Sequence, residues 1–313
     1  MHELVFFRCI STHSQFRIMH VPVLLQEVVS GLQAREGDII LDATVGGGGH
    51  SEALCKDLGG VATFLCLDAD SDAIARSRER LKSSRCMFLF YRTNYRYLDT
   101  ALASLGVAGV NRVLFDLGLS SLQLEESGRG FSFLRDEPLL MTFEKETEEG
   151  TLTARTVLNE WSEETITAIL ESYGEERYAR RIAGRIVEAR KQRPIETTFE
   201  LAAIVRSAAR KTGRIHPATK TFQALRIAVN DEFQGLKDGL RKAWEKLLPG
   251  GRIAVISFHS MEDRVVKDFF RELGKKKIGT VVTKKPITPG EEEQQNNPRS
   301  RSAKLRIIEK RHF

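Results

Sequence analysis

A run of four consecutive glycines most constrains how this chain can fold. Residues 42–50, Asp-Ala-Thr-Val-Gly-Gly-Gly-Gly-His, follow the apolar run 39–41 and precede a helical pattern over residues 51–58. Glycines in such a loop permit φ > 0 and leave the backbone bare for a ligand. Strand, glycine loop and helix in this order are typical of a nucleotide-binding α/β unit, in which the ligand lies against the loop.

The residues around the glycines favour a cationic nucleotide-like ligand over a dinucleotide. In the fingerprint G-x-G-x-x-G/A the third small position is occupied here by Ser51. A carboxylate at Asp42 repels a pyrophosphate but suits the amino-acid end and sulfonium of S-adenosylmethionine. A second apolar run, 62–67, ends in Asp68, which is placed to hold ribose hydroxyls. We therefore expect an S-adenosylmethionine site; a ligand-free turn and a nicotinamide oxidoreductase remain as alternatives.

Alternating strand and helix patterns predict an α/β fold with a doubly wound, mostly parallel sheet. Seven strand-like runs cover residues 39–42, 62–68, 87–91, 112–116, 252–258, 279–283 and 303–309. Helices are expected between them at 71–81, 98–105, 154–160 and 261–273, a turn is expected at 248–251, and the polar stretch 286–298 is expected to be a mobile loop. Between Asp116 and Arg252 the sequence is mostly helical, and this stretch is far longer than a usual crossover. It therefore predicts an inserted helical subdomain, after which the helices at 219–231 and 233–248 return to the sheet.

Charge and hydropathy indicate which kind of partner the protein binds. The chain is 41% apolar and 29% charged, as soluble globular proteins are, and no apolar run approaches the roughly 20 residues that cross a bilayer. We expect no membrane partner. Residues 264–313 contain 14 Lys or Arg and 6 Asp or Glu, which gives this segment a net charge of +8. The rest of the chain is slightly acidic. A basic end suits a polyanion; a solvated surface is the alternative.

The cysteines and the N-terminal residues indicate the cellular compartment in which the protein is expected. The chain has four cysteines, none in C-x-x-C spacing: Cys9, Cys55, Cys66 and Cys86. We expect them to be reduced residues of a cytoplasmic protein and expect no metal site. Residues 1–18 are expected to be a plain extension before Met19, with a transit peptide as the alternative.

Four polar segments follow predicted strands: the glycine loop, Asp68, residues 116–121 (Asp-Leu-Gly-Leu-Ser-Ser) and residues 257–260 (Ser-Phe-His-Ser). The carboxyl ends of parallel strands meet at one sheet edge, where ligands bind in open α/β sheets. We expect these segments to converge there. Asp116 is the strongest candidate, although a helix N-cap is the alternative for a single Asp at a strand end.

Long motifs from about residue 20 to 309 resemble the bacterial 16S rRNA (cytosine-N4)-methyltransferase family. They are HVPVLL at 20–25, the loop 42–50, DLGLSS at 116–121 with QL at 123–124, RGFSF at 129–133, YGEER at 173–177, PATKTFQALRI at 217–227, NDE at 230–232, residues 256–264 and NPRSRSAKLR at 297–306. The resemblance implies a class I, Rossmann-like, seven-stranded fold. It divides the chain into an extension (1–18), a methyltransferase domain (19–124 and 221–313) and a helical substrate-recognition subdomain (125–220).

The resemblance also implies a substrate and a site. The family uses S-adenosylmethionine to methylate the exocyclic N4 of a cytidine in the decoding region of small-subunit rRNA, so the expected partner is that rRNA or the small ribosomal subunit; a homodimer is left open. The expected cofactor contacts are Asp42, Gly46, Gly48, Gly49, His50, Asp68, Tyr95, Asp116 and Gln123. The expected RNA contacts are Arg129, Phe131, Phe133, Lys220, Arg226, Phe258, Arg299, Arg301, Lys304 and Arg306. The aromatic residues among them are equally compatible with a place in the core.

Methylation of a cytosine amino group needs in-line placement and a proton acceptor, because the nitrogen lone pair is delocalised into the ring. Asp116 is the preferred acceptor, and His259 is a candidate relay or a structural residue of its loop. One segment departs from the family: PLLMTF at 138–143 has Leu140 and Thr142 where the family typically has Asp and Arg. An amino-methylase of DNA or another RNA, and a non-catalytic RNA-binding assembly factor, therefore remain alternatives.

Overall fold

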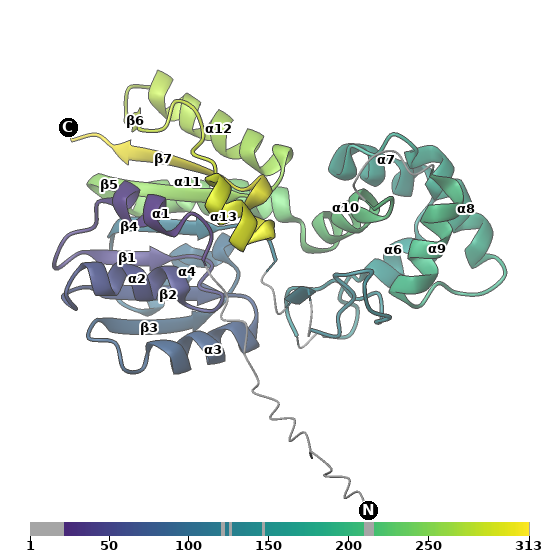
Figure 1. Cartoon of the computed structure of the whole chain (residues 1–313), viewed down its shortest axis with the longest axis horizontal. Helices are drawn as coiled ribbons and strands as arrows, with labels where there is room; N and C mark the ends of the chain where they lie inside the picture. Colours follow the sequence, from purple (N-terminus) through teal and green to yellow (C-terminus); the bar gives the residue numbers. More distant parts are fainter. Residues whose placement is uncertain (1–21, 120–122, 125–126, 146–147, 210–215, 313) are drawn as a thin grey trace, which may run out of the picture.

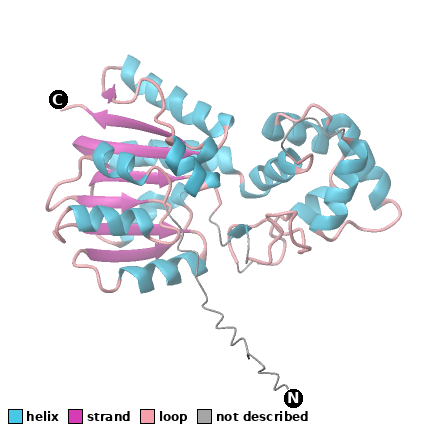
Figure 2. Cartoon of the chain, in the orientation of Figure 1, coloured by secondary structure: helices cyan, strands magenta, loops and turns pink. Residues whose placement is uncertain are grey.

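A computed structural model describes residues 22–119, 123–124, 127–145, 148–209 and 216–312. The chain forms two lobes that lie side by side, one built around a single sheet and one made of helices (Figures 1 and 2). Within the described ranges, no helix combines the length and apolar character that a membrane span requires.

The sheet has seven strands in the order β3-β2-β1-β4-β5-β7-β6. The strands are β1 (Ile39–Asp42), β2 (Thr63–Asp68), β3 (Met87–Arg92), β4 (Val110–Asp116), β5 (Leu247–Ser257), β6 (Gly279–Val281) and β7 (Lys304–Lys310). Only β7 runs antiparallel, to both β5 and β6. The chain order reverses between β1 and β4, and this switch point is where such sheets bind ligands. The expected mostly parallel, doubly wound sheet is confirmed.

Helices cover both faces of the sheet. Alternate strand residues point to opposite faces, so Ile40 and Leu114 enter one apolar cluster while Leu41 and Phe115 enter the other. The first cluster is closed by α1 (Leu25–Leu32), α2 (Gly49–Asp57) and α3 (Ser71–Leu81). The second is closed by α4 (Leu98–Ser104), α11 (Glu232–Lys246) and α12 (Ser260–Lys275). A short helix, η1 (Tyr95–Tyr97), precedes α4.

The helical lobe has a hydrophobic core of its own. It contains α6 (Ala154–Glu160), α7 (Glu163–Gly174), α8 (Ala179–Arg190), α9 (Thr198–Ala208) and α10 (Thr219–Asn230). We expected α10 to return to the sheet, but its Phe222 and Leu225 belong to the core of the helical lobe. The chain turns back toward the sheet at Asp231, in a left-handed conformation with φ of 46°, and α11 is the helix that packs there.

Two segments differ from the expected pattern. The polar stretch 286–298, which we expected to be a mobile loop, contains α13 (Glu291–Asn296) and leads into η2 (Pro298–Ser302). A long-range contact holds α13, because Leu24 N donates to Glu293 Oε1 at 2.8 Å. The turn expected at 248–251 instead lies within β5, where the register against β4 shifts. Neither the long-range hydrogen bond nor the bulge leaves a local sequence signal.

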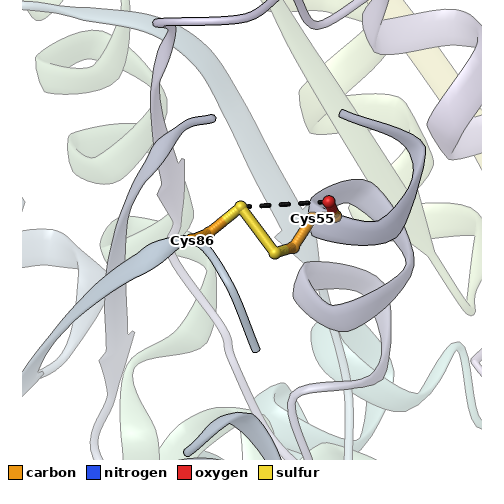
Figure 3. The surroundings of a disulfide bond; sticks show 2 residues. All are labelled: Cys55 and Cys86. Carbon is orange, nitrogen blue, oxygen red and sulfur yellow. Dashed lines mark hydrogen bonds between the residues drawn. A yellow bond between two sulfur atoms is a disulfide. The ribbon is translucent and has the colours of Figure 1, made fainter. Parts of the chain in front are cut away.

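A disulfide joins Cys55 on α2 to Cys86 just before β3 (Figure 3), so the expectation of reduced cysteines is wrong for this pair. The two Cα atoms lie 6.0 Å apart, within the range of native disulfides. The 31-residue separation gives no hint of the pair, because packing of α2 beside β3 brings the cysteines together. Cys66 is buried and free, and Cys9 lies outside the described residues.

Candidate functional site

A pocket opens at the carboxyl edge of the sheet, beside β1, β2, β4 and β5. Its wall contains these predicted site residues: Gly46, Gly49, His50, Asp68, Tyr95, Asp116, Gln123, Phe258 and Arg299. Residues leading into and out of the helical lobe, Phe143 and Phe233, complete the wall. The strand-end segments that we expected to meet therefore do so where they are described; Ser120 and Ser121 lie outside the described residues.

The glycine loop turns tightly under the pocket. Gly46 and Gly48 have φ of 51° and 75°, which only glycine adopts readily. Gly48 N donates to Val45 O at 2.7 Å, and Gly48 is the residue before α2. A Cβ on Gly49 would lie 2.4 Å from Pro22 Cγ, so the chain preceding α1 packs directly on the loop. Gly48 itself lies behind the wall, where it shapes the turn.

Asp42 also lies behind the loop rather than in the pocket wall, so the direct ligand contact expected of it is corrected. Its side chain is only 2% exposed. The carboxylate accepts hydrogen bonds from Ser51 Oγ at 2.6 Å and from Thr44 N at 3.3 Å. Burial raises its pKa to about 6. Asp42 thus orients the start of the loop and the first turn of α2.

Asp68 links the end of β2 to the glycine loop. Its Oδ2 accepts from Gly46 N at 2.9 Å and its Oδ1 accepts from Asp70 N at 2.9 Å. Burial raises the pKa of this carboxyl to about 6, and Arg76 in the same wall opposes that rise. Each oxygen keeps lone-pair capacity for a ligand hydroxyl, as the ribose role requires.

Asp116 contributes an incompletely hydrogen-bonded carboxyl to the wall. Its backbone N donates to Thr44 Oγ1 at 2.7 Å, which fixes the end of β4 against the loop. Its Oδ1 is buried and has no hydrogen-bond partner in the described part of the chain. Its Oδ2 lies 3.6 Å from His50 Nδ1. Burial, with a smaller effect from Glu262, raises its pKa to about 7. A buried acceptor without a partner in a pocket is suited to a ligand N–H.

Tyr95 and Gln123 lie where the predicted cofactor role places them, in the wall. Tyr95 packs edge-on against Phe115, with ring centroids 5.6 Å apart, and burial raises the pKa of its phenol. Gln123 is 9% exposed, and its Nε2 lies 3.4 Å from Asp70 Oδ2. Tyr95 therefore contributes an aromatic ring to the pocket wall.

His259 lies outside the wall and acts locally. Its Nδ1 accepts from Glu262 N at 3.3 Å and Glu262 Oε2 accepts from His259 N at 3.3 Å, which together form a capping box that starts α12. This is the structural alternative that the sequence left open. Burial alone would raise the pKa of Glu262, but the hydrogen bond and charge of His259, together with Arg226, hold it below its usual value. The sequence analysis did not single out Glu262, although a Glu three residues after a cap is a recognisable signal.

Three of the predicted RNA contacts are buried. Arg129 is 5% exposed; its Nη2 donates to Asp70 Oδ2 at 2.7 Å and its Nη1 to Phe143 O at 2.6 Å. Phe131 belongs to the core of the helical lobe. Arg226 forms two hydrogen bonds with Glu232, at 2.7 and 2.8 Å. These side chains stabilise the junction of the lobes and do not face solvent, so the structure corrects their expected role as direct RNA contacts.

The remaining predicted RNA contacts are exposed or partly exposed: Phe133, Lys220, Arg299, Arg301 and Lys304. Phe133 stacks on His216 with centroids 4.3 Å apart. Arg306 differs, because it is 6% exposed and paired with Asp263 at 2.6 Å. A count of basic residues along the sequence cannot separate a paired arginine from an exposed one.

The segment 138–143, whose sequence differs from the family pattern, lies against the junction of the lobes. Thr142 is 4% exposed, and its carbonyl accepts from Arg129 Nη1 at 3.2 Å. Asn230 at the end of α10 fixes the neighbouring backbone, because its Oδ1 accepts from Phe143 N at 2.9 Å and its Nδ2 donates to Met141 O at 2.7 Å. The segment that lacks the family's Asp and Arg thus presents Phe143 to the pocket.

Comparisons with known proteins agree with this site. Residues 17–311 match the sequence profile of the MraW methylase family. Ribosomal RNA small subunit methyltransferase H of Brevibacillus brevis is 44% identical over 310 residues, which cover 93% of this chain and 98% of that protein. The protein of the same name from Persephonella marina is 48% identical over 297 residues, covering 94% and 99%. That from Paenibacillus sp. is 45% identical over 316 aligned positions, covering 93% and 99%.

Proposed function

The chain belongs to the MraW methylase family, and from this premise we propose that it methylates small-subunit rRNA with S-adenosylmethionine as methyl donor. The proposed acceptor is the exocyclic N4 of a cytidine in the decoding region. The observation that carries the proposal is the carboxyl of Asp116, which is 21% exposed and lies in the wall of the pocket beside the glycine loop.

The described residues fit this cofactor. The loop turns through Gly46 and Gly48 at positive φ and leaves its backbone bare at the pocket. Three carboxylates surround the loop, the buried Asp42 and the partly exposed Asp68 and Asp116, and they suit a ligand that carries an ammonium and a sulfonium. Asp68 would hold the ribose, and Tyr95 and Gln123 would contact the base. When bound, the cofactor supplies an electrophilic methyl group.

Asp116 is the residue that handles the proton. An amino nitrogen that gains a methyl group must lose one proton, and the partly exposed carboxyl of Asp116 in the pocket wall can accept it. Burial places the Asp116 pKa at about 7, near the pH at which a general base works best. Thr44 holds this residue through its backbone N. Water-excluding walls come from Leu117, Phe143 and Phe258.

The surface beside the pocket suits an RNA strand. Arg299 lies in the pocket wall, and Arg301 is exposed on the same short helix, η2. Lys220 lies on α10 across the junction, where its Nζ donates to Glu175 O at 2.7 Å. Phosphate contacts position an RNA, while base stacking and base-edge contacts select the nucleotide. We place this reaction in the cytoplasm, where small subunits are assembled.

The test is nucleoside mass spectrometry of small-subunit rRNA from cells with and without the protein. We expect N4-methylcytidine to be lost at one decoding-region position without it. The wild-type gene and the Asp57→Asn control, which changes an exposed Asp on α2, should restore the modification. The Asp116→Asn variant should not restore the modification, because a general base typically accelerates such a reaction about 10²–10⁴-fold. An unchanged modification profile in the deletion strain would refute the rRNA assignment.

A further inference from the structure

We propose that Phe143 is the platform on which the acceptor base stacks when it enters the pocket. Phe143 directly follows the two positions, 140 and 142, at which the chain departs from the family, and no role was expected for it from the sequence. The inference rests on the proposed methyl transfer and deepens it, because it identifies a side chain that holds the cytosine while its amino group reacts.

Phe143 closes the pocket from the side of the helical lobe. It packs against the hydrophobic core of that lobe, whereas the glycine loop, Asp116 and Phe258 follow strands of the sheet, and all of them line the same pocket. Phe143 is partly exposed rather than buried, so it has surface that a ligand can cover. A base that enters at the junction of the lobes therefore passes between Phe143 and the strand ends.

The strand order separates the side of the pocket expected for the cofactor from the side open to a base. The glycine loop and Asp68 follow β1 and β2, whereas Asp116 and Phe258 follow β4 and β5, which lie on the other side of β1. Phe233 on α11 also lies on the β5 side, because its ring centroid is 6.0 Å from that of His259. Phe233 and Phe258 thus surround with apolar surface the space from which an amino group can reach Asp116.

The backbone of Phe143 is fixed at both of its polar groups. Its N donates to Asn230 Oδ1 at 2.9 Å, and its O accepts from Arg129 Nη1 at 2.6 Å. Arg129 is itself held by Asp70, because its Nη2 donates to Asp70 Oδ2 at 2.7 Å. A residue that is already held in place loses little conformational freedom when a ligand binds, which favours binding.

The ring of Phe143 is supported from behind. It stacks on Phe131, with centroids 6.1 Å apart and planes inclined by 27°. Phe131 is only 6% exposed, and the Arg129 guanidinium lies 5.5 Å from its ring centroid, so Phe131 cannot readily move aside. A base on Phe143 would extend this row of rings. Stacking on aromatic side chains is the usual way in which proteins hold unpaired RNA bases.

The proposed reaction needs such a support. A base must leave its stack, or be unpaired already, to reach an enzyme pocket, and stacking on a side chain replaces the contacts that it loses. Stacking uses the face of the base, so the N4 amino group at its edge stays available to Asp116 and to the methyl donor. Every base has such a face, so Phe143 contributes affinity for a base and leaves the choice of cytosine to contacts at the base edge.

The test compares Phe143→Leu with wild type, with Phe143→Tyr and with the matched control Phe199→Leu. Leucine keeps an apolar side chain but removes the flat ring, and Phe199 is a 48% exposed phenylalanine on α9, outside the pocket wall. We expect kcat/KM for methyl transfer to fall about 5- to 100-fold in Phe143→Leu, the range that the loss of one base–aromatic stack produces. Phe143→Tyr should recover most of that rate, and Phe199→Leu should match wild type. The calorimetric Kd of Phe143→Leu for S-adenosylhomocysteine should be unchanged.

The second readout needs no turnover. In wild-type protein labelled with 13C in its phenylalanine rings, saturating small-subunit rRNA with S-adenosylhomocysteine should shift the Phe143 resonance, which is assigned by its absence from Phe143→Tyr. A wild-type kcat/KM in Phe143→Leu or an unmoved Phe143 resonance would overturn the inference. An equal loss of S-adenosylhomocysteine affinity would overturn it as well, by placing the ring on the cofactor. The spectrum decides even if Phe143→Leu does not fold. Failure of the proposed function differs from these results, since the wild-type enzyme would then transfer no methyl group to small-subunit rRNA.

Discussion

At the scale of single residues, the buried carboxyl of Asp116 gives the protein a predictable pH dependence. Its pKa of about 7 in the folded state lies above the ordinary value of 3.8, because burial disfavours the charged form. A raised acidic pKa stabilises the fold below the unfolded-state pKa, and this contribution is lost as pH rises through the folded-state value. Between pH 4 and 8 the ligand-free protein must therefore bear a growing cost from this group.

Asp116→Asn removes that dependence, since an amide does not ionise. We expect the unfolding free energy of the variant, relative to wild type, to rise from pH 5 to pH 8 by about 2–3 kcal/mol, because each of the two pH units between pH 5 and the folded-state pKa of about 7 contributes about 1.4 kcal/mol. Denaturant titrations of both ligand-free proteins at pH 5, 6, 7 and 8 measure it. Asp68 should titrate alike in both proteins and cancel, whereas Asp42, whose pKa the Asp116 charge helps to raise, adds a smaller change in the same direction. Parallel curves for the two proteins would contradict the raised pKa.

Gly49 is predicted to be sterically indispensable, whereas its neighbour Gly47 is not. A Cβ at position 49 would lie 2.4 Å from Pro22 Cγ, while one at position 47 meets nothing within 4 Å. We expect Gly49→Ala to lower the melting temperature of the ligand-free protein by several degrees, because about 1–3 kcal/mol is typical of overpacking. Gly47→Ala, the matched control, should melt within about one degree of wild type. Equal melting temperatures for the two variants would show that the Pro22 contact yields easily.

Most pocket residues could be found from the sequence because they lie directly after strands. Asp68 and Asp116 end β2 and β4, and parallel strands bring their carboxyl ends together whatever the rest of the fold does. The roles of Arg129 and Arg226 could not be found in this way. Each pairs with a specific carboxylate, Asp70 or Glu232, and a pairing of this kind depends on tertiary packing.

At the scale of elements, the Arg129–Asp70 pair ties the segment before the helical lobe to the start of α3. Both side chains are buried, at 6% and 2% exposure. We expect Arg129→Met to cost about 3–5 kcal/mol of unfolding free energy, because it leaves Asp70 buried and unpaired. Urea denaturation monitored by circular dichroism measures this loss.

The same two elements offer a matched control. Lys145 and Asp72 form a pair at 3.1 Å with side-chain exposures of 55% and 46%. Solvent screens such a pair, so Lys145→Met should cost less than about 1 kcal/mol. If both variants lose the same small amount, Arg129 contributes packing rather than a required counter-charge.

Two capped helices agree with prediction to the residue, while α12, expected at 261–273, is longer and covers 260–275. Asp70 caps α3, which covers 71–81 as expected, and α6 covers 154–160 behind Thr153. The helix α13 has no buried residue and no apolar face, so periodicity could not reveal it. The sequence also could not show which lobe α10 packs in, because an amphipathic helix can pack in either one. Its contacts with α7 place it in the core of the helical lobe.

At the scale of the whole molecule, the excess positive charge lies in the C-terminal part of the chain, and part of it borders the pocket. Residues 264–313 contain 14 Lys or Arg against 6 Asp or Glu, but several of these cations are paired, as Arg306 is with Asp263. Arg301 on η2 is exposed and close in sequence to the pocket-wall residue Arg299, so it is placed to neutralise a phosphate beside the pocket. The pocket lies where the two lobes meet, so an RNA strand that reaches Asp116 passes η2.

This placement predicts the salt dependence of RNA binding. Each phosphate contact contributes about 0.7–0.9 to the slope of log K against log salt. We expect Arg301→Gln to weaken binding of small-subunit RNA and to reduce that slope by about 1, as measured by filter binding between 50 and 300 mM KCl, about the range in which such slopes are resolved. Lys56→Gln removes a cation of 73% side-chain exposure near the end of α2, which leads away from the pocket edge, and should leave the slope unchanged. Equal slopes for Arg301→Gln and wild type would mean that the RNA approaches the pocket from the helical lobe instead, past Lys220.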